Sequence, residues 1–163
     1  MDTRIALVWL ATHLTLPAGW TASQHDNIQA YRNADQTQAL TIATYALEHG
    51  AALEEVMQRS VEARRAGERD LASGRLFLSA VTRHRADGIS QLRYYGFDEA
   101  ANRRFVNLIV AARGRMWNFY YEAIGTPQPQ FEQSSRTIFR EIEAPAVERI
   151  ADTVDAADRI LAR

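Results

Sequence analysis

Residues 98–125, DEAANRRFVNLIVAARGRMWNFYYEAIG, carry the strongest structural signal in the sequence. Apolar residues recur through this stretch at helical spacing, and one row repeats every seven residues at Phe105, Ala112 and Phe119. Such periodicity is typical of an amphipathic helix. Asp98 is suited to cap the start of this helix, and Gly125, which precedes Thr-Pro, is suited to end it. We therefore expect one helix over 98–124, roughly 40 Å long.

Three flanking stretches show the same seven-residue repeat of apolar positions, over 24–66, 70–95 and 134–162. The connection between 70–95 and 98–124 is very short, which predicts that these two helices are antiparallel neighbours. No Val/Ile/Thr-rich alternating run and no hairpin turn such as Asn-Gly stands out. The predicted fold is therefore all-α, an antiparallel four-helix bundle with an additional short N-terminal apolar helix.

Residues 1–23 form an apolar N-terminal segment, separate from the single helical-bundle domain predicted over 24–163. Its core, IALVWLATHLTL at 5–16, is too short to span a bilayer, which needs roughly 20 residues. The run resembles a secretory signal, and it is also compatible with a short buried helix or with a segment that docks on a partner. Both the cytoplasm and export to a bacterial periplasm stay open, and membrane contact is expected through 5–16 if at all.

The composition is that of a globular chain: 163 residues, 47% hydrophobic and 24% charged. The sequence has no cysteine, which excludes disulfides, Cys-ligated zinc, iron–sulfur clusters and thiol catalysis. All 19 basic residues are Arg, so the chain has neither a Schiff-base lysine nor a Walker-type phosphate loop. Neither an H-E-x-x-H nor a G-x-S-x-G motif is present. We predict no cofactor, and the sequence leans toward a protein that is not an enzyme.

The charges are unevenly distributed along the chain. Residues 59–115 hold twelve Arg against six acidic residues, although the net charge of the whole chain is −1. This basic middle either packs beside acidic flanking helices or binds an anionic partner, such as nucleic acid along 70–124. Acid–arginine pairs with i,i+4 spacing are expected on exposed helical faces: Glu55–Arg59, Glu99–Arg103, Glu132–Arg136 and Asp155–Arg159.

Arg85 is the main candidate for a ligand-binding residue. The seven-residue pattern turns its side chain inward, and a buried guanidinium must be paired with an anion. Three interpretations stay open for Arg85: an internal ion pair with Asp35 or Glu48, a side chain that extends to the surface, and a pocket for a small anionic ligand. The expected lining of the ligand site comes from the same two predicted helices: Tyr94, Tyr95, Arg113 and Trp117.

Two histidines are weak candidates for a metal or haem site. His49 and His84 fall on or beside the apolar seams of two predicted helices, where facing histidines can hold a metal in a bundle core. We interpret each of them as an ordinary hydrogen-bonded or half-exposed histidine, so we predict no metal site.

Three functional hypotheses follow. The first is a non-enzymatic helical module for interaction or structure, exported or oligomeric, with a protein partner or a second copy of itself. The second is a helical bundle that binds a small anionic ligand or cofactor near Arg85. The third is nucleic-acid binding through 70–124, with the WNFYY run at 117–121 as a stacking platform.

Overall fold

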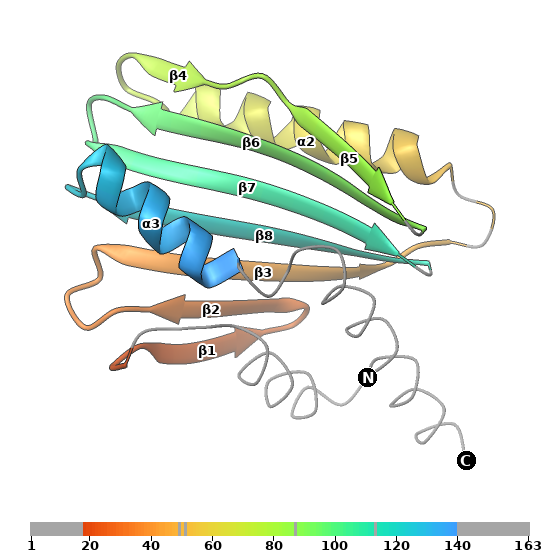
Figure 1. Cartoon of the computed structure of the whole chain (residues 1–163), viewed down its shortest axis with the longest axis horizontal. Coiled ribbons are helices and arrows are strands. Elements are labelled where there is room, and N and C mark those ends of the chain that lie inside the picture. The colour runs from red at the N-terminus through yellow and green to blue at the C-terminus, as the bar shows by residue number, and fades with distance from the viewer. Residues whose placement is uncertain (1–17, 49, 51, 87, 113, 140–163) are drawn as a thin grey trace.

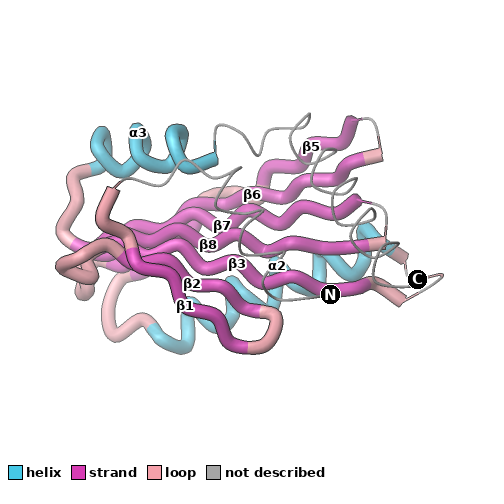
Figure 2. Tube along the Cα trace, turned by 90° about the horizontal axis from the view of Figure 1, so that it is seen from below, coloured by secondary structure: helices cyan, strands magenta, loops and turns pink. Residues whose placement is uncertain are grey.

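The computed structural model describes residues 18–48, 50, 52–86, 88–112 and 114–139. This part of the chain forms an eight-stranded antiparallel sheet with one helix on each face (Figures 1 and 2). The helices are α2 (Leu53–Leu71) and α3 (Gln128–Phe139). The strands are β1 (Thr21–His25), β2 (Ile28–Arg32), β3 (Gln38–Ala46), β4 (Leu76–Leu78), β5 (Thr82–Ala86), β6 (Ile89–Asp98), β7 (Arg103–Ala112) and β8 (Arg115–Ile124). They lie in the order β1-β2-β3-β8-β7-β6, and the short strands β4 and β5 both pair with β6 at the outer edge.

The predicted helix over 98–124 is wrong, and with it the four-helix bundle. This stretch is the β7–β8 hairpin, in which Arg103 pairs with Ile124 at one end and Ala112 with Arg115 at the other. Only two residues separate the strands, and Gly114 has a φ of +74°, a conformation that glycine adopts without strain. Nearly every residue of β7 and β8 is buried, because each face of the sheet carries a helix. The sequence of a strand that is buried on both faces is a continuous apolar run, and such a run also matches the spacing of apolar residues in a helix.

The other predicted helices are corrected in the same way. Residues 24–66 contain β1 to β3 before α2 begins, and 70–95 contain the end of α2, β4, β5 and most of β6. The antiparallel pairing predicted between 70–95 and 98–124 does hold, as the pairing of strands β6 and β7. Of the range 134–162, residues up to Phe139 belong to α3. The remainder of that range lies outside the described residues, as does the predicted apolar segment over 5–16.

Two of the predicted i,i+4 ion pairs are confirmed and one is wrong. Glu55–Arg59 joins at 2.6 Å on α2, and Glu132–Arg136 joins at 3.6 Å on α3. Glu99 instead lies in the β6–β7 turn, and its carboxylate is 3.9 Å from Arg75. The pair Asp155–Arg159 lies outside the described residues. No described helix is long and apolar enough to cross a membrane.

Each face of the sheet has its own hydrophobic core. The core under α2 contains a row of rings from three adjacent strands, Tyr94, Phe105 and Tyr120, with centroids 6.4 and 5.5 Å apart. The ring of Phe105 crosses Gly96, where an added Cβ would lie 2.0 Å from Phe105 Cζ. The core under α3 contains Phe131, Ile138 and Phe139 from the helix, together with alternate residues of β7 and β8.

Arg103 anchors α2 to the sheet. Its guanidinium lies 2.7 Å from Glu68 of α2 and 3.0 Å from Glu122 of β8. The hydroxyl of Tyr120 donates a hydrogen bond of 2.6 Å to the same Glu68 carboxylate. Burial is the largest single effect and lowers the pKa of Arg103, but the hydrogen bonds and charges of Glu68, Tyr120 and Glu122 together outweigh it, so the net pKa is raised. This arginine therefore stays charged inside the α2–sheet interface.

Candidate functional site

A groove runs between α3 and the outer strands of the sheet, and it is the candidate functional site. Its larger part has a volume of about 770 Å³, and the described residues that line it are Arg93, Tyr95, Gln128, Glu132, Gln133, Ser135, Arg136, Thr137 and Phe139. Its smaller part, of about 290 Å³, is lined by Phe77, Leu78, Ser79, Tyr95, Gly96, Phe97, Gln128 and Phe131. Tyr95 and Gln128 line both parts, so the two cavities meet at these residues. We call the larger part the cationic arm and the smaller part the apolar arm.

The alternation of side chains along β6 determines which of its residues form the sheet wall of the groove. Arg93, Tyr95 and Phe97 are alternate residues of β6, so their side chains project from the same face of the sheet. That face is the one on which α3 packs, since Ile89 lies on the same alternation and belongs to the α3 core. The three side chains therefore face α3 across the groove.

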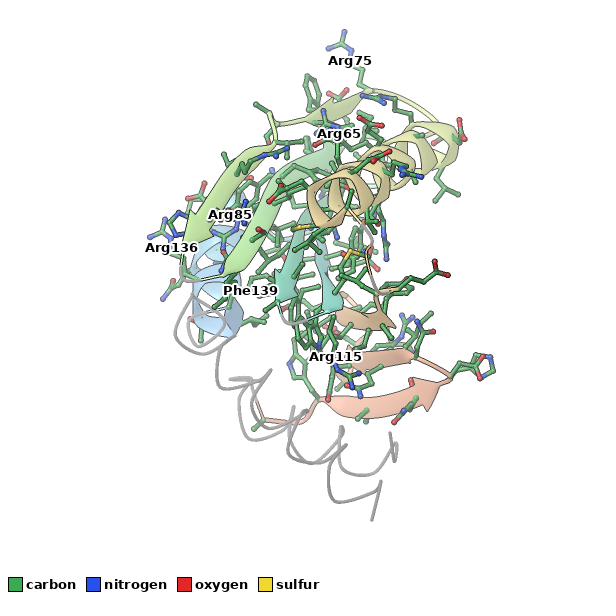
Figure 3. The ribbon with its side chains drawn as sticks, turned by 90° about the vertical axis from the view of Figure 1, so that its right-hand side faces the viewer. Arg65, Arg75, Arg85, Arg115, Arg136 and Phe139 are labelled. Atoms are coloured by element: carbon green, nitrogen blue, oxygen red, sulfur yellow. The ribbon has the colours of Figure 1, made fainter. Side chains whose placement is uncertain are left out.

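The cationic arm holds two arginines and one carboxylate. Arg136 lies 3.6 Å from Glu132, and the side chains are 81% and 45% exposed. Glu132 also accepts a hydrogen bond of 3.0 Å from Gln128. Arg93 is partly buried and has no ion pair with any other described residue. The described residues of the arm therefore carry an excess positive charge. Arg136 and Phe139 lie together on α3 in Figure 3.

The apolar arm is formed by three phenylalanines. Phe77 of β4 is 54% exposed, and its ring stacks at 6.4 Å on that of Phe97. Phe131 of α3 is buried and stacks at 5.3 Å on Tyr121 of β8, whose pKa burial raises. An exposed aromatic beside a buried one forms a surface that an apolar side chain of a ligand can cover.

Arg104 fixes the junction between the arms. Its guanidinium lies 4.3 Å from the centre of the Phe97 ring, donates to Gln128 Oε1 at 2.8 Å and donates to the Thr126 carbonyl at 2.9 Å. Gln128 in turn donates to Glu132. These contacts connect β7 to the start of α3 and hold the junction side chains in one arrangement before any ligand binds.

The structure does not bring the predicted site residues together. Arg85 is exposed on the edge strand β5, with its guanidinium 3.8 Å from Glu54 rather than from Asp35 or Glu48. Tyr94 is buried under α2, whereas Tyr95 is 37% exposed on the opposite face and lines the groove. Trp117 is buried in the α3 core, and Arg113 lies outside the described residues. The prediction failed because adjacent residues of a strand point to opposite faces.

The structure describes one of the two weak histidine candidates for a metal site. His84 is exposed on β5, opposite Gln91 of β6, and His49 lies outside the described residues. Within the described ranges, no group of three or more His, Asp or Glu side chains is placed to hold a metal ion.

The sequence contained signals for the sheet wall of the groove. Asp87-Gly88 lies between β5 and β6 and is one of the strongest hairpin dipeptides, and Gly88 has a φ of +77°. Interpreting 89–98 as a strand would have placed Arg93, Tyr95 and Phe97 on one face. No such signal identifies the residues of α3 that close the groove, because they come from a separate element.

No family model and no curated protein matches this sequence. Solved structures do resemble the fold. The solution structure of cyanobacterial PsbP (CyanoP) from Synechocystis sp. PCC 6803 matches with a TM-score of 0.59 at 12% identity, over 77% of this chain and 82% of that chain. LpqN of Mycobacterium tuberculosis, which is involved in cell envelope biogenesis, matches with a TM-score of 0.47 at 14% identity, over 77% of this chain and 78% of that chain. The chain thus shares its overall fold with CyanoP, an antiparallel sheet between helices rather than a helical bundle.

Proposed function

We propose that this protein is a non-enzymatic binding module that holds a segment of a partner protein in the groove between α3 and β6. The observation that carries the proposal is Arg93, a partly buried cation that lines the groove and has no ion pair among the described residues. A partly buried charge is favourable only when it is paired, and since no described residue pairs with Arg93, an anionic group of a ligand is suited to do so.

The chemistry of the lining supports binding rather than catalysis. Glu132 is the one carboxylate among the described lining residues, and it is engaged by Arg136 and Gln128. The remaining lining groups are aromatic, amide, hydroxyl and guanidinium groups, which orient a ligand through stacking and hydrogen bonds. Export and self-association through 5–16 stay predictions, because those residues lie outside the described part of the chain.

A selection experiment tests the proposal without a known ligand. A display library of random twelve-residue peptides is selected on the wild-type protein, and the enriched peptides are measured by fluorescence polarisation. Thr137→Trp fills the groove from an exposed lining position of α3. Gln130→Trp adds the same side chain at an exposed position of α3 outside the groove and serves as the matched control.

We expect the selected peptides to bind Thr137→Trp at least about tenfold more weakly than the wild type, a loss of about 1.4 kcal/mol. Binding to Gln130→Trp should be unchanged. Peptides that bind Thr137→Trp as well as they bind the wild type, or a selection that enriches nothing, would contradict the groove as the binding site.

A further inference from the structure

We infer that the groove recognises an extended peptide segment with a carboxylate side chain and an aromatic side chain four residues apart. The inference rests on the proposed function and adds the chemistry of the ligand. In this arrangement the carboxylate lies in the cationic arm beside Arg93, and the aromatic side chain lies in the apolar arm against Phe77 and Phe97.

The spacing follows from the two walls of the groove. On β6, Arg93 and Phe97 are four residues apart on one face, which corresponds to about 13 Å along a strand. On α3, Gln128 and Arg136 are eight residues apart, about 12 Å along a helix axis. An extended peptide spans this distance with four residues and presents residues i and i+4 on the same side. A helical peptide places i and i+4 only about 6 Å apart, which is too short to reach both arms.

The positive charge of the cationic arm favours a carboxylate as the ligand group that binds there. Among the described lining residues, Arg93 and Arg136 contribute two positive charges against the one carboxylate of Glu132. A bound carboxylate would balance the arm, and Arg is well suited to pair with it through two parallel N–H donors. A hydrogen bond to a charged group contributes more than one between neutral groups, so a Glu-to-Gln change in the peptide should weaken binding measurably.

The centre of the groove adds no requirement for charge. A side chain at i+2 of the ligand faces the junction, where Tyr95 and Gln128 lie. Gln128 is bonded to both Arg104 and Glu132, so charges of both signs lie beside this position. The carboxylate of Glu132 disfavours single-stranded nucleic acid, whose phosphates repeat along the whole backbone and require a continuous cationic track.

Nine-residue peptides test the ligand chemistry. The reference probe is GSESGSFSG, with its Glu and Phe at i and i+4. Its variants carry Gln for Glu (GSQSGSFSG), Ala for Phe (GSESGSASG), a second Glu at i+2 (GSESESFSG), or a spacing shortened by one residue (GSESGFSSG). Each probe is titrated by NMR into the wild type, Arg93→Glu, Phe77→Ala and Thr137→Trp, together with the exposed-residue controls Arg32→Glu and Leu71→Ala.

We expect the reference probe to bind about tenfold more tightly than the Gln, Ala and shortened-spacing variants, and about as tightly as the variant with a second Glu at i+2. Arg93→Glu should weaken binding of the reference probe and leave binding of the Gln variant nearly unchanged. Phe77→Ala should likewise weaken binding of the reference probe and leave binding of the Ala variant nearly unchanged. Arg32→Glu and Leu71→Ala should change no affinity. Unchanged melting temperatures of the variants exclude loss of folding as the cause.

The inference and the proposed function fail in different ways. If Thr137→Trp abolishes binding but the probes show no coupling to Arg93 or Phe77, the groove binds peptides and this ligand chemistry is wrong. If Thr137→Trp has no effect on probes that bind, the groove is not the binding site and the proposed function is wrong. If oligothymidine displaces the reference probe and depends on Arg93, the occupant is a nucleic acid and the inference is overturned.

Discussion

Tyr94 and Tyr95 are adjacent in the chain and differ in every structural respect. Tyr95 is partly exposed in the groove, whereas Tyr94 is 1% exposed under α2, and its hydroxyl has no hydrogen-bond partner within the described structure. Burial, with a smaller contribution from the negative charge of Glu68, raises the pKa of Tyr94 from 10.0 to about 12. The environment of a residue in this sheet is thus decided by the face on which it lies.

Tyr94→Phe should reduce the alkaline loss of stability. The folded pKa is raised, so ionisation of Tyr94 opposes folding: the stability is unaffected below pH 10 and falls as the pH rises from 10 to about 12, by about 3 kcal/mol in total. We therefore expect the free energy of unfolding of Tyr94→Phe to fall less steeply over this interval. At pH 7 the variant should be as stable as the wild type or about 1 kcal/mol more stable, because the unpaired hydroxyl is gone.

Urea denaturation at pH 7, 10 and 11 measures both effects. Tyr45→Phe is the matched control, because Tyr45 is 40% exposed on β3. An alkaline slope that is the same for wild type and Tyr94→Phe would show that Tyr94 does not carry the raised pKa.

At the scale of elements, the position of α2 depends on a charged cluster rather than on apolar contacts alone. Arg103 lies among three carboxylates, those of Glu68, Asp98 and Glu122, at distances of 2.7, 3.9 and 3.0 Å. Sequence periodicity placed Arg103 on the exposed face of a helix, paired with Glu99. Its actual role depends on α2 crossing β7, and local spacing carries no information about that crossing.

Arg103→Met should destabilise the protein by about 3–5 kcal/mol, because it leaves buried carboxylates without their cation. Arg75→Met is the matched control: Arg75 is 78% exposed and lies 3.9 Å from Glu99, so its removal should cost less than about 1 kcal/mol. In Figure 3 this side chain projects away from the molecule. Urea denaturation of both variants measures the difference, and equal losses would mean that the cluster does not hold α2.

At the scale of the whole molecule, β7 and β8 belong to both cores. Leu108 and Ile109 are adjacent on β7, and each is almost fully buried on a different face. The central strands therefore couple the packing of α2 to the packing of α3, and we expect the sheet and both helices to unfold in one transition.

Leu108→Ala and Ile109→Ala test this coupling. Each substitution leaves a cavity in one core and should lower the free energy of unfolding by about 2–5 kcal/mol. Trp117 lies in the α3 core, so its fluorescence in a Trp9→Phe, Trp20→Phe background reports on that face. Ile109→Ala, on the α2 face, should shift the fluorescence and circular dichroism transitions equally. A fluorescence transition that stays in place would show that the two faces unfold independently.

Some properties of this protein are determined by the sequence alone. The absence of Cys excludes disulfides and thiol chemistry, and local spacing correctly predicts the ion pairs Glu55–Arg59 and Glu132–Arg136. The Asp87-Gly88 dipeptide also indicates a hairpin, although the helical periodicity concealed it. These properties depend on residue identity or on residues only a few positions apart in the sequence.

The class of the fold and the groove were decided by the tertiary structure. Residues 105–112 and 116–121 are buried on both faces, so their apolar pattern loses the alternation that identifies a strand, and only pairing with β3 and β6 distinguishes strand from helix. Of the five predicted ligand-binding residues, Tyr95 alone lies in the groove among those that are described. Its companions Arg93 and Phe97 follow from alternation within β6. Arg136 and Phe131 join them because α3 packs back across the sheet, a contact between segments more than thirty residues apart in the sequence.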